Sequence, residues 1–317
     1  MNKYSIMFLL LLFMQVDGFS QDPRFSQFYA NPLYLAPSFA GATEENRLVL
    51  NYRNQWPSIP GVFLTYSFSF DHYFANFNSG VGVLVTHDRA GSGRLSNTNV
   101  GILYSYNIKI NKNFFVRPGI QLYYTQRGLD FWRLVFSDGM SPGGDTPTIE
   151  QPPFENVADI DAGASILAYT DRIWFGTTVD HILRPNQSMY GELSRVPIKI
   201  SAFGGIQIIK KGRLFKPLEE SLSVAFHFEN QGKFTQLDLG LYWFKSPLMF
   251  GFWYRGLPLI DDGFDRDAVV LLVGYKTKYL HVGYSYDFTI SQLVGATGGS
   301  HEISLMYEFA TKKRKKR

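Results

Sequence analysis

Histidine is the residue type in this sequence that could most readily hold a metal ion or act as a general base. The 317-residue chain contains six, at His72, His87, His181, His227, His281 and His301. They are scattered along the chain and show no metal-ligand spacing such as that of HExxH. We interpret them as lone polar residues on the walls or rims of the fold, so the sequence predicts no metal site.

Two further stretches could carry chemistry. Ser300 and His301 are the residue types of a nucleophile and its base, but adjacent residues of a strand face opposite ways and cannot form that pair. Gly91 and Gly93, in HDRAGSGRL, resemble a phosphate-binding loop only loosely, because the GK[ST] ending and a following helix are missing. The sequence therefore predicts no catalytic residue, no cofactor and no enzyme. A Ser/His/acid site assembled across strands is the remaining alternative.

The end of the chain shows which elements must position these side chains. Residues 301–309 alternate without interruption between apolar and largely polar side chains, with Ile303, Leu305, Tyr307 and Phe309 on one face and Glu302, Ser304, Met306 and Glu308 on the other. A period of two is that of a β-strand with two different faces. A final strand with aromatic residues on its apolar face and at its end is typical of a barrel that closes in an outer membrane.

Similar strand-like stretches recur along the chain, and we count 14. They span residues 48–56, 63–73, 80–87, 95–110, 115–129, 157–169, 173–182, 197–209, 221–230, 234–244, 248–256, 267–276, 280–286 and 299–309. Such alternation also occurs in soluble β-sandwiches, so the strands alone do not decide the fold.

The connections favour a barrel. Those at 170–172, 245–247 and 277–279 have three residues each, whereas 130–156, 183–196, 257–266 and 287–298 are long; 210–220 and 231–233 break the pattern. Short turns on one side and long loops on the other are typical of outer-membrane barrels with both termini in the periplasm. A soluble sandwich has no reason to sort its loops in this way. The sequence thus predicts an all-β fold: a transmembrane, antiparallel, up-and-down β-barrel of about 14 strands over residues 48–309.

Strand alternation also predicts where the acidic residues lie. Their positions place them on the lumenal face, where water or partner groups can solvate them: Asp71, Asp159, Asp161, Glu229, Asp238, Glu302 and Glu308. On the lipid face, a charge near the membrane midplane would cost on the order of 2 kcal/mol or more.

Composition agrees with this fold. Aromatic residues make up 16% of the chain and charged residues only 18%, and mean hydropathy is −0.10. After the first 20 residues, no window approaches the roughly 18 unbroken apolar residues of a spanning helix. The chain has no cysteine, so it forms no disulfide.

The two ends have their own composition. Residues 1–20 resemble a signal peptide, with a basic start, a short apolar run, and small residues before the predicted cleavage site. Residues 21–47 contain three prolines and several aromatic residues, which predicts an ordered periplasmic or plug-like segment packed in or under the barrel. Residues 310–317 form a basic tail that would touch anionic lipid or an acidic partner, and we predict no nucleic acid partner.

Four stretches carry a more specific pattern. They are QDPRFSQFY at 21–29 with Asn31, Ala36-Pro37 and Ala40-Gly41 after it; YRNQWP at 52–57 with Gly61, Thr65, Ser69 and Asp71; the glycine loop with Asp88, Gly91, Gly93 and Leu95; and the closing hairpin with GYSYD at 283–287, SQL at 291–293 and GGSHEI at 298–303. Together they resemble the PorP/SprF family of type IX secretion system membrane proteins, found in Bacteroidetes, over residues 21–309.

This resemblance singles out a set of motif positions as fold determinants or partner contacts. They are Asp22, Pro23, Phe25, Ser26, Gln27, Tyr52, Arg53, Gln55, Trp56, Asp88, Gly91, Gly93, Tyr286, Asp287, Gly299, Ser300, His301 and Glu302. For the glycine and tryptophan positions we favour a role in the fold, because glycine in a barrel commonly marks a bend or bulge.

The resemblance also implies a function in protein export and gliding motility. Members of the family are outer-membrane barrels needed to secrete or display large substrates, including adhesins with a C-terminal targeting domain, and they associate with periplasmic components of the type IX machinery. A barrel of about 14 strands is too narrow for a folded substrate. Holding a substrate's C-terminal domain, or coupling the membrane to periplasmic components, fits better than acting as the translocation pore.

Two alternatives to a secretion component are a passive outer-membrane channel or porin, which would use the same acidic lumen, and a purely structural anchor. The anchor would need only the basic tail and the periplasmic turns.

Overall fold

The computed structural model describes residues 22–61, 63–134, 154–211, 219–257, 267–291 and 294–310. Several sequence predictions fall outside these residues: the signal peptide at 1–20, the basic residues 312–317, most of the connections 130–156, 210–220 and 257–266, and residues 292–293 of the SQL motif.

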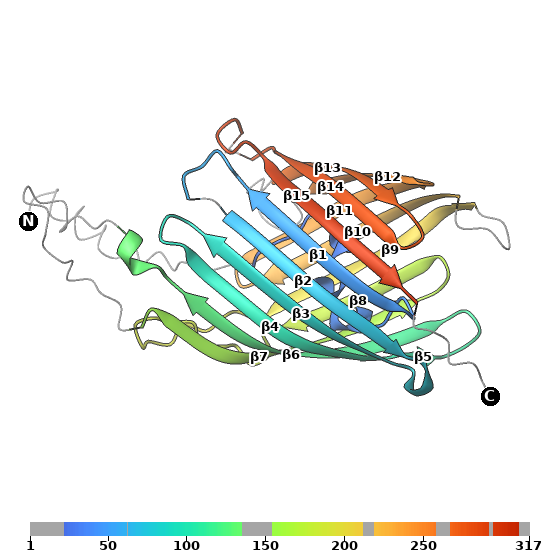
Figure 1. Cartoon of the computed structure of the whole chain (residues 1–317), viewed down its shortest axis with the longest axis horizontal. Coiled ribbons are helices and arrows are strands. Elements are labelled where there is room, and N and C mark those ends of the chain that lie inside the picture. The colour runs from blue at the N-terminus through green and yellow to red at the C-terminus, as the bar shows by residue number, and fades with distance from the viewer. Residues whose placement is uncertain are drawn as a thin grey trace, which may run out of the picture.

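Long antiparallel strands form one closed barrel (Figure 1). The strands are β1 (Asn46–Gln55), β2 (Phe63–Phe74), β3 (Ser79–Ala90), β4 (Leu95–Tyr106), β5 (Ile108–Lys109), β6 (Phe115–Gly128), β7 (Asn156–Tyr169), β8 (Ile173–Asp180), β9 (Lys199–Lys211), β10 (Glu220–Gln231), β11 (Phe234–Lys245), β12 (Leu248–Arg255), β13 (Ala268–Lys276), β14 (Leu280–Thr289) and β15 (Ser300–Phe309).

Neighbours in the sequence are neighbours in the wall. The first strand pairs with the last, and β4 pairs with both β3 and β6, so the sheet closes on itself. The two-residue β5 continues β4 along β6, so the wall has 14 strands. The bounds of each predicted strand lie within three residues of those observed, with the predicted strand 95–110 covering both β4 and β5. The closed wall of 14 strands confirms the predicted fold class.

Strand alternation sorts the side chains as the sequence predicts. In β15, Glu302 is fully buried on the lumenal face, whereas Ile303 on the other face is 49% exposed. The outer surface is accordingly apolar, with exposed side chains such as Ile102, Ile120 and Leu271. An apolar exterior around a polar interior is the pattern of a barrel surrounded by lipid.

Glycines in the wall make room for large aromatic rings. Gly240 faces Trp253 directly across β11 and β12, and a Cβ atom at Gly240 would lie 2.1 Å from that ring. The same cross-strand arrangement covers Gly101 with Tyr123, also at 2.1 Å. Each ring therefore lies flat against a glycine backbone, where any side chain would displace it.

The two ends of the barrel differ in their connections. At one end, which we call the turn end, β1 begins opposite the last residue of β15, and the connections 170–172, 246–247 and 277–279 are short. At the other, the loop end, the connections 181–198 and 290–299 are longer, although 232–233 is a tight turn. Short turns face the periplasm in outer-membrane barrels, so we assign the turn end to that side.

Among the described residues, no helix is long and apolar enough to cross a membrane.

The outward side chains near the middle of a strand should tolerate no charge. Ile102, in the middle of β4, is 66% exposed on the lipid face, so Ile102→Arg should destabilise the barrel by about 2–4 kcal/mol in urea unfolding from lipid vesicles. Tyr106→Arg, at the turn end of the same strand and face, should cost at most about 1 kcal/mol. Equal costs for the two variants would contradict a membrane-spanning orientation of β4.

Candidate functional site

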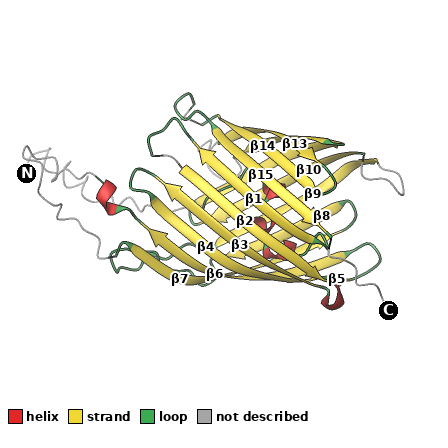
Figure 2. Cartoon of the chain, viewed as in Figure 1, coloured by secondary structure: helices red, strands yellow, loops and turns green. Residues whose placement is uncertain are grey.

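The segment that precedes the barrel lies inside it. We call residues 22–45 the lumenal plug; Figure 2 shows its short helices within the ring of strands. The helices are η1 (Phe28–Ala30), α2 (Pro32–Leu35) and η2 (Pro37–Phe39). A proline begins each of the last two, where its missing N–H costs no hydrogen bond. Leu33, Ala36 and Ala40 are completely buried.

The plug runs along the lumen from the loop end to the turn end. Asp22 donates its backbone N–H to Gln231, the last residue of β10, at the loop end (3.2 Å). Gly41 donates to Asp71, which lies toward the turn end of β2 (2.7 Å). The prediction that both termini lie at the periplasmic end is therefore wrong for the start of the described chain. The strands begin and end at the turn end, but Asp22 lies at the opposite mouth.

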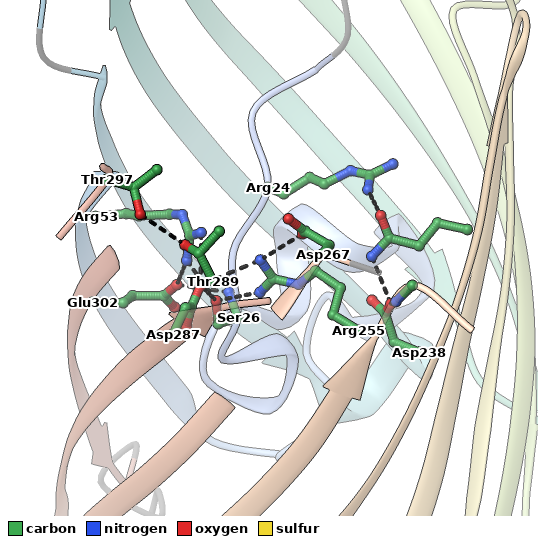
Figure 3. A network of polar contacts seen from close by, with 12 residues as sticks. Arg24, Ser26, Arg53, Asp238, Arg255, Asp267, Asp287, Thr289, Thr297 and Glu302 are labelled. Atoms are coloured by element: carbon green, nitrogen blue, oxygen red, sulfur yellow. Dashed lines mark hydrogen bonds and ion pairs between the residues drawn. The ribbon is translucent and has the colours of Figure 1, made fainter. Parts of the chain in front are cut away.

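A buried group of charges holds the plug in the lumen (Figure 3). We call Ser26, Arg53, Arg255, Asp287 and Glu302 the ionic cluster. Arg53 pairs with Asp287 at 2.8 Å and with Glu302 at 3.2 Å, and Arg255 pairs with Asp287 at 3.2 Å. The hydroxyl of Ser26 donates to Asp287 (2.7 Å) and accepts from both guanidinium groups. Two cations and two anions thus neutralise each other away from water.

Glu302 binds the plug backbone directly. Its carboxylate accepts the backbone N–H groups of Ser26 (2.6 Å) and Gln27 (3.0 Å). The Gln27 side chain donates to the backbone carbonyl of Glu302 (3.0 Å) and accepts from Ser304 (2.6 Å). Hydrogen bonds to a charged acceptor are about twice as strong as neutral ones, so this two-residue stretch is held firmly against the wall.

Strand register explains why these residues meet. Arg53 and Glu302 are direct partners across the β1–β15 pair, which joins the first strand to the last. Glu302 also faces Ser285 on β14, two residues before Asp287. Since all of these side chains occupy lumenal positions of the alternation, residues far apart in the sequence converge on one point of the wall.

A second group of charges holds the plug at the loop end. Asp22 contacts Lys199 Nζ at 2.7 Å and His181 Nε2 at 2.9 Å; His181 Nδ1 lies 2.5 Å from Asp161. Lys199 also reaches Asp180 at 3.4 Å. We call these five residues the mouth cluster: Asp22, Asp161, Asp180, His181 and Lys199.

The charges of the mouth cluster set its protonation states. Burial alone would raise the pKa of Asp22, but His181 and Lys199 outweigh it and hold that pKa well below its usual value. Burial alone would lower the pKa of His181, but Asp22 and Asp161 raise it to about 10. His181 is therefore a cation at neutral pH.

Glycines allow the plug to approach the wall closely. A Cβ atom at Gly80 would lie 1.9 Å from the carbonyl oxygen of Ala40, and one at Gly119 would lie 2.3 Å from the backbone nitrogen of Ser38. No other residue type fits these two positions with the plug in place.

Ten of the motif positions gather in two places inside the barrel. Ser26, Gln27, Arg53, Asp287 and Glu302 are in the ionic cluster or bonded to it. A second set lines a cavity of about 340 Å³ at the loop end, and comprises Asp22, Pro23, Gln55, Trp56 and Asp88.

Other motif positions support the fold. Phe25 is buried against Tyr34, with ring centroids 5.0 Å apart. Gly91 and Gly93 form the tight β3–β4 connection, where Gly91 has a φ of +75°. Gly299 also has a positive φ and lies against the carbonyl oxygen of Asp287.

Three motif positions face away from the lumen. Tyr52 packs on Tyr66 on the outer wall (5.2 Å between centroids), and His301 contacts the Tyr286 ring there at 4.9 Å. Ser300 is buried on the opposite face from His301, as strand alternation predicts. The motif therefore mixes lumenal residues with residues of the outer surface.

Arg255 and Lys199 were not predicted as site residues, and the interpretation of His181 as a lone polar residue is wrong, because it contacts Asp22 and Asp161. Arg255 follows Gly251 and Trp253 at lumenal positions of β12. Strand alternation could therefore have placed this cation on the lumenal face, which also carries several acids. His181 and Lys199 border the long connection 181–198, whose path no periodicity predicts.

Within the described ranges, no group of three or more His, Cys, Asp or Glu side chains could hold a metal ion.

A protein-family model for type IX secretion system membrane protein PorP/SprF matches residues 17–307, nearly the whole chain. The chain belongs to the PorP/SprF family. A search of curated proteins gave no match.

Solved structures similar to this PorP/SprF chain include a porin, an outer membrane protein and a transporter. The KdgM porin is 10% identical and aligns over 83% of this chain and 99% of its own, with a TM-score of 0.40. Omp33 of Acinetobacter baumannii is 10% identical over 84% and 99%, with a TM-score of 0.41. The toluene transporter TodX of P. putida is 12% identical over 87% and 93%, with a TM-score of 0.48. These likenesses concern the barrel fold.

Removing one charge of the ionic cluster should release the plug. Glu302→Gln keeps the shape but leaves Arg53 without one of its two acids, and losing a partner of a buried pair costs about 3–5 kcal/mol. Backbone amides of residues 26–28 should then exchange with deuterium at least ~100-fold faster, since about 1.4 kcal/mol is a factor of ten. Hydrogen-exchange mass spectrometry measures this.

Glu308→Gln is the matched control, because it makes the same change on the lumenal face of the same strand, away from the plug backbone. Protection of residues 26–28 that is equal in both variants would contradict the role assigned to Glu302.

The mouth cluster should make plug attachment depend on pH. Asp22 stabilises plug attachment fully above its ordinary pKa of about 3.9. This stabilisation is lost as pH falls through the lowered pKa of Asp22 in the folded protein. His181 contributes fully below its ordinary pKa of about 6.5, and its contribution is lost as pH rises through about 10. A spin label on Pro23→Cys, unique in a chain without cysteine, should be immobile at pH 6–8 and become mobile near pH 10. In His181→Gln the transition near pH 10 should disappear; its persistence there would assign it to another group.

Proposed function

We propose that this PorP/SprF barrel is an outer-membrane component of the type IX secretion machinery that supports secretion or surface attachment of large adhesin-type substrates. The family match supports the secretion context, and the occupied lumen supports a binding role. The single observation that carries the choice is the lumenal plug, whose central residues Leu33 and Ala36 have no exposed surface.

The proposed partners follow from this arrangement. A secreted substrate with a C-terminal targeting domain would be held by the barrel, and periplasmic type IX components would contact the turn end. Lipid of the outer membrane would cover the apolar outer wall, with its exposed residues such as Ile102 and Tyr307. The proposal extends to gliding motility through the adhesins displayed, and it involves no catalysed reaction.

A passive channel is the alternative function, and the plug argues against it. A porin lumen has to be wide and continuously hydrated, whereas here a polypeptide segment bonds to the wall at both ends and at the ionic cluster. In planar bilayers we expect the wild-type barrel to be nearly silent. A steady conductance with the plug fully protected from hydrogen exchange would favour the channel.

Deletion of the gene should remove surface adhesin and reduce secretion of its substrate, with both restored by the wild-type gene. The protein tagged in an extracellular connection should, from outer membranes in mild detergent, co-purify with a large surface adhesin or with periplasmic ring components, identified by mass spectrometry. An unrelated tagged 14-strand barrel from the same membranes is the control. Unchanged secretion in the deletion strain, together with recovery of the barrel alone, would overturn the proposal.

A further inference from the structure

Two adjoining cavities remain between the plug and the wall. One, of about 350 Å³, lies beside Trp174, Phe203, Tyr242 and Trp253 of strands β8 to β12. The other, of about 280 Å³, lies beside strands β12 to β15. Both are lined by Tyr29 of the plug and by Arg47 of β1. We call the first the aromatic cavity and the second the basic cavity.

The position of these cavities points to the periplasmic side. Trp174 is the second residue of β8, which begins at the turn end, and Lys276, in the basic cavity, is the last residue of β13, which ends there. Tyr242 lies three residues before the turn end of β11. A ligand would therefore enter from the end with the short turns, which faces the periplasm in outer-membrane barrels.

The wall of the aromatic cavity is built to keep space open. Trp253 lies flat on Gly240, and Phe203 lies on Gly176, where a Cβ atom would be 2.5 Å from its ring. Because these glycines have no side chains, the rings rest on the wall and leave the space before them free. The volume falls in the range of natural ligand sites, which are mostly apolar with a few polar groups.

Polar atoms at the cavity are poorly satisfied. Trp253 is only 3% exposed, and neither its indole N–H nor the buried hydroxyl of Tyr242 beside it makes a hydrogen bond of good geometry among the described residues. The buried hydroxyl of Tyr29, which lies near Ser304, makes none either. Buried donors without partners cost free energy, so the fitting ligand brings hydrogen-bond acceptors as well as an apolar body.

The plug shows what kind of molecule this wall accepts. Phe28 packs against His227 and Trp253, with centroids 4.4 and 5.3 Å apart, and Tyr29 packs against Tyr242 at 5.0 Å. The wall thus already binds the aromatic side chains of an irregular, proline-containing peptide, and the free cavity continues the same surface.

The basic cavity adds a preference for negative charge. Its lining carries two cations, Arg47 and Lys276, and one acid, Glu308. Arg47 already pairs with Asp71 at 2.9 Å, which leaves Lys276 as the main cation toward an incoming group. A carboxylate a few ångströms from an anchored ring would lie beside it.

We propose that the two cavities form a peptide-binding site, which takes an aromatic side chain in the aromatic cavity and a carboxylate of the same segment in the basic cavity. The segment comes from a polypeptide that reaches the barrel from the periplasm. This inference rests on the proposed function, since it names the kind of segment by which the barrel would hold a secreted or periplasmic partner.

The test uses the purified full-length barrel in lipid nanodiscs. The probe is the peptide acetyl-Ser-Gly-Asp-Gly-(4-fluoro)Phe with a free C-terminal carboxylate, followed by fluorine NMR. Binding should be saturable and shift the fluorine signal, because the ring enters a box of aromatic rings. An otherwise identical peptide with a blocked carboxylate should bind at least 3-fold more weakly.

Two variants of equal local disturbance separate the site from the rest of the barrel. Gly240→Ala pushes the Trp253 ring into the aromatic cavity and should weaken binding at least 10-fold. Gly101→Ala creates the same 2.1 Å contact, with Tyr123 on another part of the wall, and should change binding less than 2-fold. Lys276→Gln, which displaces no ring, should abolish the difference between the free and blocked peptides.

The outcomes are distinct. No saturable binding, or equal weakening by Gly240→Ala and Gly101→Ala, would overturn the site. Equal binding of 4-fluorophenylacetate and the peptide would mean a small aromatic acid as ligand, and would overturn the peptide assignment. Peptide binding needs no secretion, so a deletion strain with normal secretion would reject the proposed function without touching this result.

Discussion

The carboxylate of Glu302 bonds both to the closing strands and to the plug. It bonds to Arg53 across the pair of strands that closes the barrel and to two backbone N–H groups of the plug. A charge with no exposed surface is tolerable only when such partners surround it. The closing strands and the plug therefore satisfy each other's hydrogen bonds and charges. Without the plug, the Glu302 carboxylate would lose two of its hydrogen-bond donors.

The interior of this barrel is packed as the apolar core of a soluble protein is, but largely with polar and charged groups. Its buried residues include many hydroxyl, amide and charged groups, and small apolar clusters such as Leu33, Ala40, Leu84 and Leu103 lie between them. The interior is closely packed because some wall glycines lie against aromatic rings and others lie against the backbone of the plug. Hydrogen bonds are directional, so this interior restricts the plug backbone to fewer paths than a purely apolar core would.

Local pattern was enough to predict the wall and a plug-like segment before it, but not the path of that segment. Alternation with a period of two is a property of each strand by itself, and so the strands and the lumenal acids such as Asp71 and Glu302 could be read from the sequence. The path of the plug depends on contacts such as that between Ser26 and Glu302, 276 residues apart, which no local pattern encodes. The alternation of β12 places Arg255 on the lumenal face, but its partners on the plug and on other strands could not be read from that pattern. Tyr52 and His301 show the converse: motif membership marked them, although alternation places both on the outer wall.

The location of Glu302 on the last strand has a consequence for biogenesis. The group that binds Ser26 and Gln27 is synthesised near the end of the chain, whereas the plug is synthesised first. The plug therefore lacks its contacts with Glu302 until β15 pairs with β1. Closing the ring and forming the Glu302 contacts to the plug are thus one event in time, and a barrel that stalls before its last strand is added lacks these contacts.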